Sequence, residues 1–137
     1  MRTCSTADLA LTVGADQPKY HVGDQPGITL DLVNTSATTC TGDFGPANQD
    51  AKVYARSNRL WSSNDCHPSD DHIVVTLRPG EHFRYTIKWA GYTSLPGCAP
   101  SHILVGAGIY QAYGAVDGLR GAVRLEIWPA ETAAQAG

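Results

Sequence analysis

Hydrophobic and polar side chains alternate over several short stretches of the chain, most regularly in His82–Trp89. A period of two residues places one face of a β-strand in a core and the other face in water. We therefore expect the apolar side chains of this stretch to point inward and the polar ones to face solvent. The apolar positions are Phe83, Tyr85, Ile87 and Trp89, and the polar positions are His82, Arg84, Thr86 and Lys88.

Other stretches with the composition of strands are separated by turn residues and polar loops. Pro79 and Gly80 take the central positions of a turn directly before the most regular stretch. The expected loops are Asn34–Gln49, Asn64–Asp71 and Gly91–Pro100. The expected extended segments are Asp8–Gly14, Lys19–Val22, Ile28–Asn34, Asp50–Arg56, Arg59–Ser62, His72–Leu77, His82–Trp89, His102–Val105, Gly108–Val116 and Ala122–Trp128.

Short strands with frequent turns and no helical period predict an all-β antiparallel β-sandwich of about seven to nine strands. A chain of 137 residues is long enough for one core, so we expect a single domain over residues 1–128. Residues 129–137 are rich in Ala and polar, and are expected to form a flexible tail. The predicted core consists of Leu30, Leu32, Val53, Phe83, Tyr85, Ile87, Tyr110, Leu125 and Ile127.

Composition and charge exclude several classes of function. The formal net charge is −3, from 10 Lys and Arg against 13 Asp and Glu, and the charges are scattered. Nucleic-acid binding needs a basic stripe, so a nucleic-acid partner is not expected. No apolar run is long enough for a membrane-spanning helix. No hydrophobic leader follows Met1, so a signal peptide is either absent from this chain or already removed.

The chain has four cysteines, Cys4, Cys40, Cys66 and Cys98, and no two form a Cys-x-x-Cys pair. An even number at wide spacing favours two disulfides and therefore an oxidising, extracytoplasmic compartment, as in a secreted protein or the external domain of a membrane-anchored one. A Cys/His metal site is the alternative, which the spacing disfavours.

Three disulfide pairings are possible, and the expected strand positions favour Cys4–Cys40 with Cys66–Cys98. Cys4 precedes the first strand and Cys40 follows a later one, at positions that neighbouring strands bring together. Cys66 and Cys98 each lie in a loop after a strand, so both can lie at one end of a sandwich. Each bridge would close a loop of about 30–40 residues, worth about 3.5–4 kcal/mol in the chain-entropy model.

No catalytic constellation is present, and we expect no enzyme, no bound metal and no cofactor. There is no Gly-x-Ser-x-Gly elbow, and two disulfides would use every thiol. Asp70, Asp71 and His72 are clustered, but in a polar loop where solvated charges are common. Asn34-Thr35-Ser36 matches the N-glycosylation pattern, although such short matches arise often by chance.

Four segments carry a resemblance to a known family: Gly27–Cys40, Asp50–Cys66, Leu77–Trp89 and Gly108–Val116. Their order resembles the BsuPI-type domain, an immunoglobulin-like domain named from an intracellular proteinase inhibitor. The corresponding features are Asn34, Trp61-Ser62, Pro79-Gly80-Glu81, Trp89 and Gly108-Ile109-Tyr110, and together they span about three quarters of the chain. The resemblance implies an immunoglobulin-like fold.

The four cysteines depart from the intracellular namesake and are similar to disulfide-bonded, extracytoplasmic domains of actinobacterial cell-envelope proteins. We therefore expect a noncatalytic interaction domain whose partner is a protein or another cell-envelope component. The alternative is a proteinase inhibitor of the BsuPI type, although no inhibitory residue corresponds between the family and this chain.

A Cys66–Cys98 bridge would hold the loops Ser62–Asp71 and Gly91–Pro100 together on one end of the sandwich. Three aromatic residues lie within or beside these loops, and they are the candidate binding residues: Tyr92, Trp61 and Trp89. Trp61 and Trp89 lie at strand ends and are expected to pack into the core, whereas Tyr92 is expected to be an exposed contact.

Overall fold

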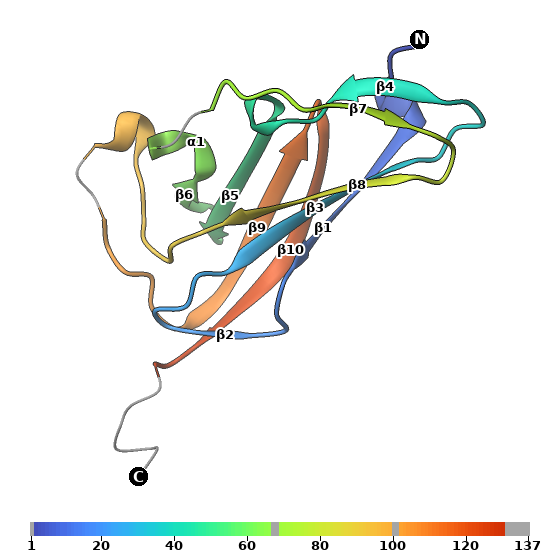
Figure 1. Ribbon diagram of the computed structural model, residues 1–137. Coiled ribbons are helices and arrows are strands. Elements are labelled where there is room, and N and C mark those ends of the chain that lie inside the picture. The colour runs from blue at the N-terminus through green and yellow to red at the C-terminus, as the bar shows by residue number, and fades with distance from the viewer. Residues whose placement is uncertain (1, 67–68, 100–101, 131–137) are drawn as a thin grey trace.

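The computed structural model describes residues 2–66, 69–99 and 102–130, and its strands form two main β-sheets (Figure 1). The first sheet has the order β1 (Leu9–Ala15), β3 (Gly27–Asn34), β8 (His82–Lys88). The second has the order β2 (Tyr20–His21), β10 (Leu119–Trp128), β9 (Gly108–Val116), β5 (Gln49–Ala55), β6 (Asn58–Ser62). A small sheet pairs β4 (Cys40–Asp43) with β7 (Val74–Leu77). The helical turns are η1 (Thr6–Asp8), η2 (Pro46–Asn48), α1 (Ser63–Cys66) and η3 (Pro96–Cys98).

The strand order is that of an immunoglobulin-like sandwich. One sheet carries the first, second and fifth strands of that plan (β1, β3, β8), and the other carries the remaining strands (β10, β9, β5, β6). All pairs within the sheets are antiparallel except β2 with β10, which run parallel. The expected fold is therefore confirmed, with one parallel edge strand that the hydrophobic pattern did not predict.

The core lies between the two sheets, but the predicted core residues are not equally buried. Those that are fully buried are Leu30, Leu32, Val53, Leu125 and Ile127. Phe83, Tyr85, Ile87 and Tyr110 are only half-buried. Three of these four lie on β8, which pairs with β3 alone, so one side of the strand has no neighbour in its sheet. The polar positions of β8 are exposed, as the alternation predicted.

Several predicted boundaries were wrong. The expected loop Asn34–Gln49 contains β4, and the expected loop Asn64–Asp71 begins inside α1. Residues His102–Val105 form no strand and make only a single bridge, between Leu104 and Tyr92. The expected tail 129–137 lies mostly outside the described residues, which end at position 130. Within the part of the chain that the structure describes, no helix is long and apolar enough to cross a membrane.

Strand β10 begins at Leu119, three residues before the predicted start. Gly121 broke the hydrophobic pattern there, and packing explains why a glycine is present. A Cβ on Gly121 would lie 2.8 Å from a methyl group of Val13, which packs across from the other sheet. The strand continues through this position because the residue has no side chain.

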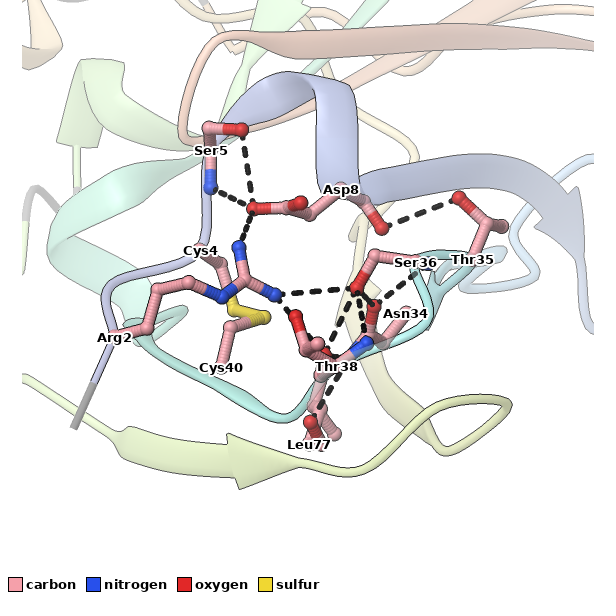
Figure 2. A network of polar contacts seen from close by, with 10 residues as sticks. All are labelled: Arg2, Cys4, Ser5, Asp8, Asn34, Thr35, Ser36, Thr38, Cys40 and Leu77. Carbon is pink, nitrogen blue, oxygen red and sulfur yellow. Dashed lines mark hydrogen bonds and ion pairs between the residues drawn. A yellow bond between two sulfur atoms is a disulfide. The ribbon is translucent and has the colours of Figure 1, made fainter.

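The N-terminal end of the sandwich is held by Cys4–Cys40 and by the amide of Asn34 (Figure 2). The Asn34 Nδ2 donates to the carbonyl oxygens of Leu77 (2.9 Å) and Thr38 (3.0 Å). Its Oδ1 accepts from the Ser36 backbone N–H (2.9 Å) and hydroxyl (2.7 Å). All four hydrogen-bonding positions of this fully buried side chain are therefore used.

The match to the N-glycosylation pattern at Asn34-Thr35-Ser36 consequently has a structural explanation. The amide nitrogen that a glycan would modify is buried and bonded to two carbonyls in the folded chain. Arg2 adds to the same network through Asp8 (2.7 Å) and the Thr38 carbonyl (3.0 Å). The Asn-x-Ser sequence here closes a turn and joins β3 to β7.

Candidate binding site

The disulfide Cys66–Cys98 joins α1 to η3, with a Cα–Cα distance of 4.4 Å. Both bridges are those that the strand positions favoured. Residues 60–66, 91–99 and 102–105 are the segments that this bridge and its neighbouring hydrogen bonds hold together, and we call them the stapled end. It lies at the left of Figure 1, on the side away from β4 and the N-terminus.

Asp65 is the polar centre of the stapled end. This side chain is only 8% exposed, and its Oδ2 accepts from the Arg59 guanidinium (2.8 Å) and from the Ser94 hydroxyl (2.7 Å). The Ser94 hydroxyl in turn accepts from the Ser62 N–H (3.2 Å), and the Ser94 N–H donates to the Leu60 carbonyl (2.9 Å). A buried carboxylate needs such partners, so this chain of bonds fixes the 91–99 loop against β6.

A cleft of about 610 Å³ lies beside the stapled end, between β8 on one side and β6 and α1 on the other. Its walls combine aromatic rings with hydroxyl and amide groups. The aromatic residues are Trp61, Tyr85, Trp89 and Tyr92. The polar residues include Ser62, Ser63, Asn64, Thr86 and Ser94. An aromatic surface with a few convergent polar groups is the usual composition of a ligand-binding cleft.

The structure brings all three predicted binding residues to this cleft, in different settings. Trp89 is fully buried, and its indole N–H donates to the Tyr92 carbonyl oxygen at 2.9 Å. Trp61 is half-buried, and its ring lies 5.9 Å from that of Trp89. Tyr92 is 42% exposed. Trp89 therefore fixes the backbone of the loop at Tyr92 from the core, and the Tyr92 side chain is available at the surface.

An apolar surface at Tyr92 was not among the predicted features of the chain. Tyr92 and Leu104 form an antiparallel bridge, which puts their side chains on the same face. The Thr93 N–H donates to the Ile103 carbonyl (2.8 Å), so the two segments run as a short ribbon. Leu95, Ile103 and Leu104 are all exposed. No signal in the sequence indicated the exposure of Ile103 and Leu104, because both fell within the expected extended segment His102–Val105.

In the cluster Asp70, Asp71 and His72, the histidine pairs with a carboxylate from outside the cluster. The His72 imidazole bonds to the Asp43 carboxylate at the end of β4. The same carboxylate accepts from the Ile73 N–H at 3.0 Å. These bonds, the histidine first among them, hold the pKa of Asp43 below its usual value. The arrangement ties the chain before β7 to β4.

Among the described residues, one group of three potential metal donors lies close together: Cys66, Cys98 and His102. The two sulfur atoms are bonded to each other in the oxidised chain, so neither is a thiolate ligand. The group is therefore best described as a disulfide with a neighbouring imidazole.

Comparisons with known proteins give likenesses of fold. No protein-family model matches the chain, and no curated protein sequence matches it. A β-glucosidase from Erythrobacter marinus matches over 88% of this chain with 12% identity and a TM-score of 0.53. A Listeria innocua β-glucosidase in complex with laminaribiose matches over 90%, with 11% identity and a TM-score of 0.52.

The chain spans only 15% and 16% of the length of these two enzymes. The CARDB domain of the PF1109 protein from Pyrococcus furiosus, in complex with di-metal ions, matches over 88% of each chain with 13% identity and a TM-score of 0.47. The likeness to a part of each β-glucosidase supports the sandwich fold alone. The resemblance to the BsuPI-type domain stays a prediction.

Proposed function

We propose that this chain is a noncatalytic, extracytoplasmic interaction domain that binds a protein or another cell-envelope component through the stapled end. The observation that carries the proposal is the apolar patch formed by the exposed side chains of Tyr92 and Leu104, which share one face of their ribbon at the aromatic cleft. Exposed apolar side chains that gather on one loop surface mark interaction sites more often than isolated ones do.

Preorganisation supports this surface as a binding site. The Cys66–Cys98 bridge and the buried Asp65 network already order the loops that carry the patch. Association therefore does not have to order them, and the entropy cost of binding falls. Binding residues concentrate on loops that a rigid scaffold positions, and the two sheets provide that scaffold here.

The two disulfides also support the extracytoplasmic part of the proposal, because such bridges persist in oxidising compartments.

Proteinase inhibition is the second candidate, and it derives from the resemblance to the BsuPI-type domain. One feature of that resemblance, the turn Pro79-Gly80-Glu81, lies at the opposite end of the sandwich. The Gly80 N–H donates to the Asn34 carbonyl there.

Two exposed tyrosines allow a matched test. Tyr92 is 42% exposed on the stapled end, and Tyr113 is 44% exposed on β9. A component captured from an envelope extract by the immobilised domain is purified, and its affinity for each variant is measured by calorimetry. Tyr92→Ala should weaken binding at least tenfold, because exposed aromatic residues are frequent hot spots, and Tyr113→Ala should change it less than about twofold.

Equal losses in the two variants, or a loss confined to Tyr113→Ala, would overturn the stapled end as the binding surface. The intact domain is also assayed against serine, cysteine and metalloproteases. Inhibition at nanomolar concentration would replace the interaction proposal with the inhibitor alternative, whichever surface proves responsible.

A further inference from the structure

The two disulfides of the chain differ in how accessible their sulfur atoms are. Cys4 is 7% exposed and Cys40 is 0% exposed, so that bridge lies within the core. Cys66 is half-buried and Cys98 is exposed at the surface of the stapled end. Thiol–disulfide exchange requires a thiolate to reach one sulfur of the bridge. Only Cys66–Cys98 offers such access.

The backbone at Cys98 adds a second difference. Cys98 has a φ of 59°, and Gly97 before it has a φ of 72°. Glycine adopts this left-handed region readily, whereas a residue with a Cβ is disfavoured there. Cys98 is therefore held in an unfavourable conformation while it is joined to α1. Opening the bridge frees η3 to leave that conformation, which favours opening.

A third observation distinguishes the two sulfur atoms of the bridge. The Nε2 atom of His102 lies 4.0 Å from the Sγ of Cys66. An imidazole N–H beside a sulfur stabilises the thiolate form, which makes that sulfur the better leaving group. Accessibility thus directs attack to Cys98, and the imidazole favours departure of Cys66.

We infer that Cys66–Cys98 is an exchangeable disulfide and that Cys98 is a site of modification by low-molecular-weight thiols of the glutathione class. The thiolate of the small thiol attacks the Sγ of Cys98 and forms a mixed disulfide. The Cys66–Cys98 bond breaks, and its electron pair leaves on Cys66 as a thiolate beside His102. The thiolate of a second small thiol then attacks the sulfur of the first. The bond to Cys98 breaks, its electron pair leaves on Cys98 as a thiolate, and the two small thiols depart as their own disulfide. Cys4–Cys40 stays oxidised throughout.

The wild-type protein itself tests the direction of attack. The folded chain is incubated with graded concentrations of glutathione, acid-quenched, alkylated and mapped by mass spectrometry. We expect glutathione on Cys98, alkylation on Cys66, and loss of Cys66–Cys98 at least tenfold faster than loss of Cys4–Cys40. Glutathione found mainly on Cys66, or equal rates for the two bridges, would overturn the inference.

Two histidine variants test the part played by the imidazole. His102→Asn should slow exchange at Cys66–Cys98 severalfold and leave Cys4–Cys40 unchanged. His82→Asn, which alters an exposed histidine on β8, should leave both rates unchanged. Thermal unfolding under non-reducing conditions verifies that each variant is folded. An unchanged rate in folded His102→Asn would refute the role of His102. No binding partner is involved, so this result is independent of the proposed function.

Discussion

Replacing Asn34 by Ala tests whether the Asn-x-Ser sequence is a structural element of the fold. The substitution removes a fully buried amide that makes four hydrogen bonds. The carbonyl of Thr38 keeps Arg2 as a donor, and the Ser36 hydroxyl, released from the Asn34 side chain, is placed to donate to it as well, so it remains satisfied. The carbonyl of Leu77 loses its bond to the amide in a buried place, and the Ser36 N–H loses its acceptor at a partly exposed one.

The expected cost follows from these losses. A buried polar group left without its partner costs about 1–3 kcal/mol, and a hydrogen bond near the surface is worth about 1 kcal/mol. Asn34→Ala should therefore lower the free energy of unfolding by about 2–4 kcal/mol. Ser36→Ala is the matched control, since it removes only hydroxyl bonds at a partly exposed position and should cost about 1 kcal/mol or less.

Equilibrium urea unfolding with both disulfides intact measures this difference, with the fluorescence of the three tryptophans as the probe. The extrapolated free energies and the slopes are compared, so that a change in the unfolded state is recognised. A loss below about 1 kcal/mol for Asn34→Ala, or one equal to that of Ser36→Ala, would refute the structural role assigned to this amide.

Two further predictions concern β8 and its partner strand. Phe83→Ala should lower the free energy of unfolding by about 2–3 kcal/mol, somewhat less than loss of a fully buried phenylalanine, because its ring is half-buried against Phe44. Arg84→Ala should change it by no more than about 0.5 kcal/mol. Reversed effects in urea unfolding would mean that the face assigned to this strand is wrong. Burial raises the pKa of Asp31, but hydrogen bonds from His82 and Arg84 outweigh it and hold that pKa below the usual value. The carboxylate therefore stabilises the fold above about pH 4 and loses this contribution as the pH falls through its folded pKa. The difference in unfolding free energy between wild type and Asp31→Asn should therefore disappear in acid. A difference that stays constant down to about pH 2 would contradict the stabilising role of the Asp31 carboxylate.

Alternating patterns predicted the sandwich well because they reflect local burial. In β8 every second side chain is exposed, as the alternation of charged and aromatic residues indicated. The pattern could not show that β8 lies at the edge of its sheet, because strand order depends on long-range pairing. The half-burial of Phe83, Tyr85 and Ile87 follows from that position.

Strand β4 was missed for a related reason. Its sequence, Cys40–Asp43, has no apolar alternation and contains a threonine and a glycine. It is extended because it pairs with β7, more than 30 residues later in the chain. Phe44, directly after it, is fully buried and is the one strongly apolar residue of the region. A single apolar position is too little to indicate a strand.

The candidate site was predicted in outline from Cys66, Cys98 and Tyr92. The preferred pairing depended on strand positions that the structure reproduces closely enough to bring the two loops together. The Asp65 network was not predicted, because its partner Ser94 is 29 residues away in the sequence and nothing in the pattern distinguishes Arg59 from other charged residues. The cleft also depends on side chains from separate strands, which no local pattern relates.

Amide hydrogen exchange of the domain with and without its purified partner tests the central claim most directly. Segments 91–95 and 103–105 carry the apolar patch, whereas Asp117 and Gly118 form the β9–β10 turn away from it. We predict that the partner slows exchange in the two patch segments and leaves the peptide containing Asp117 and Gly118 unchanged. Protection confined to the β9–β10 turn, with the patch segments unaffected, would contradict the assignment of binding to the stapled end.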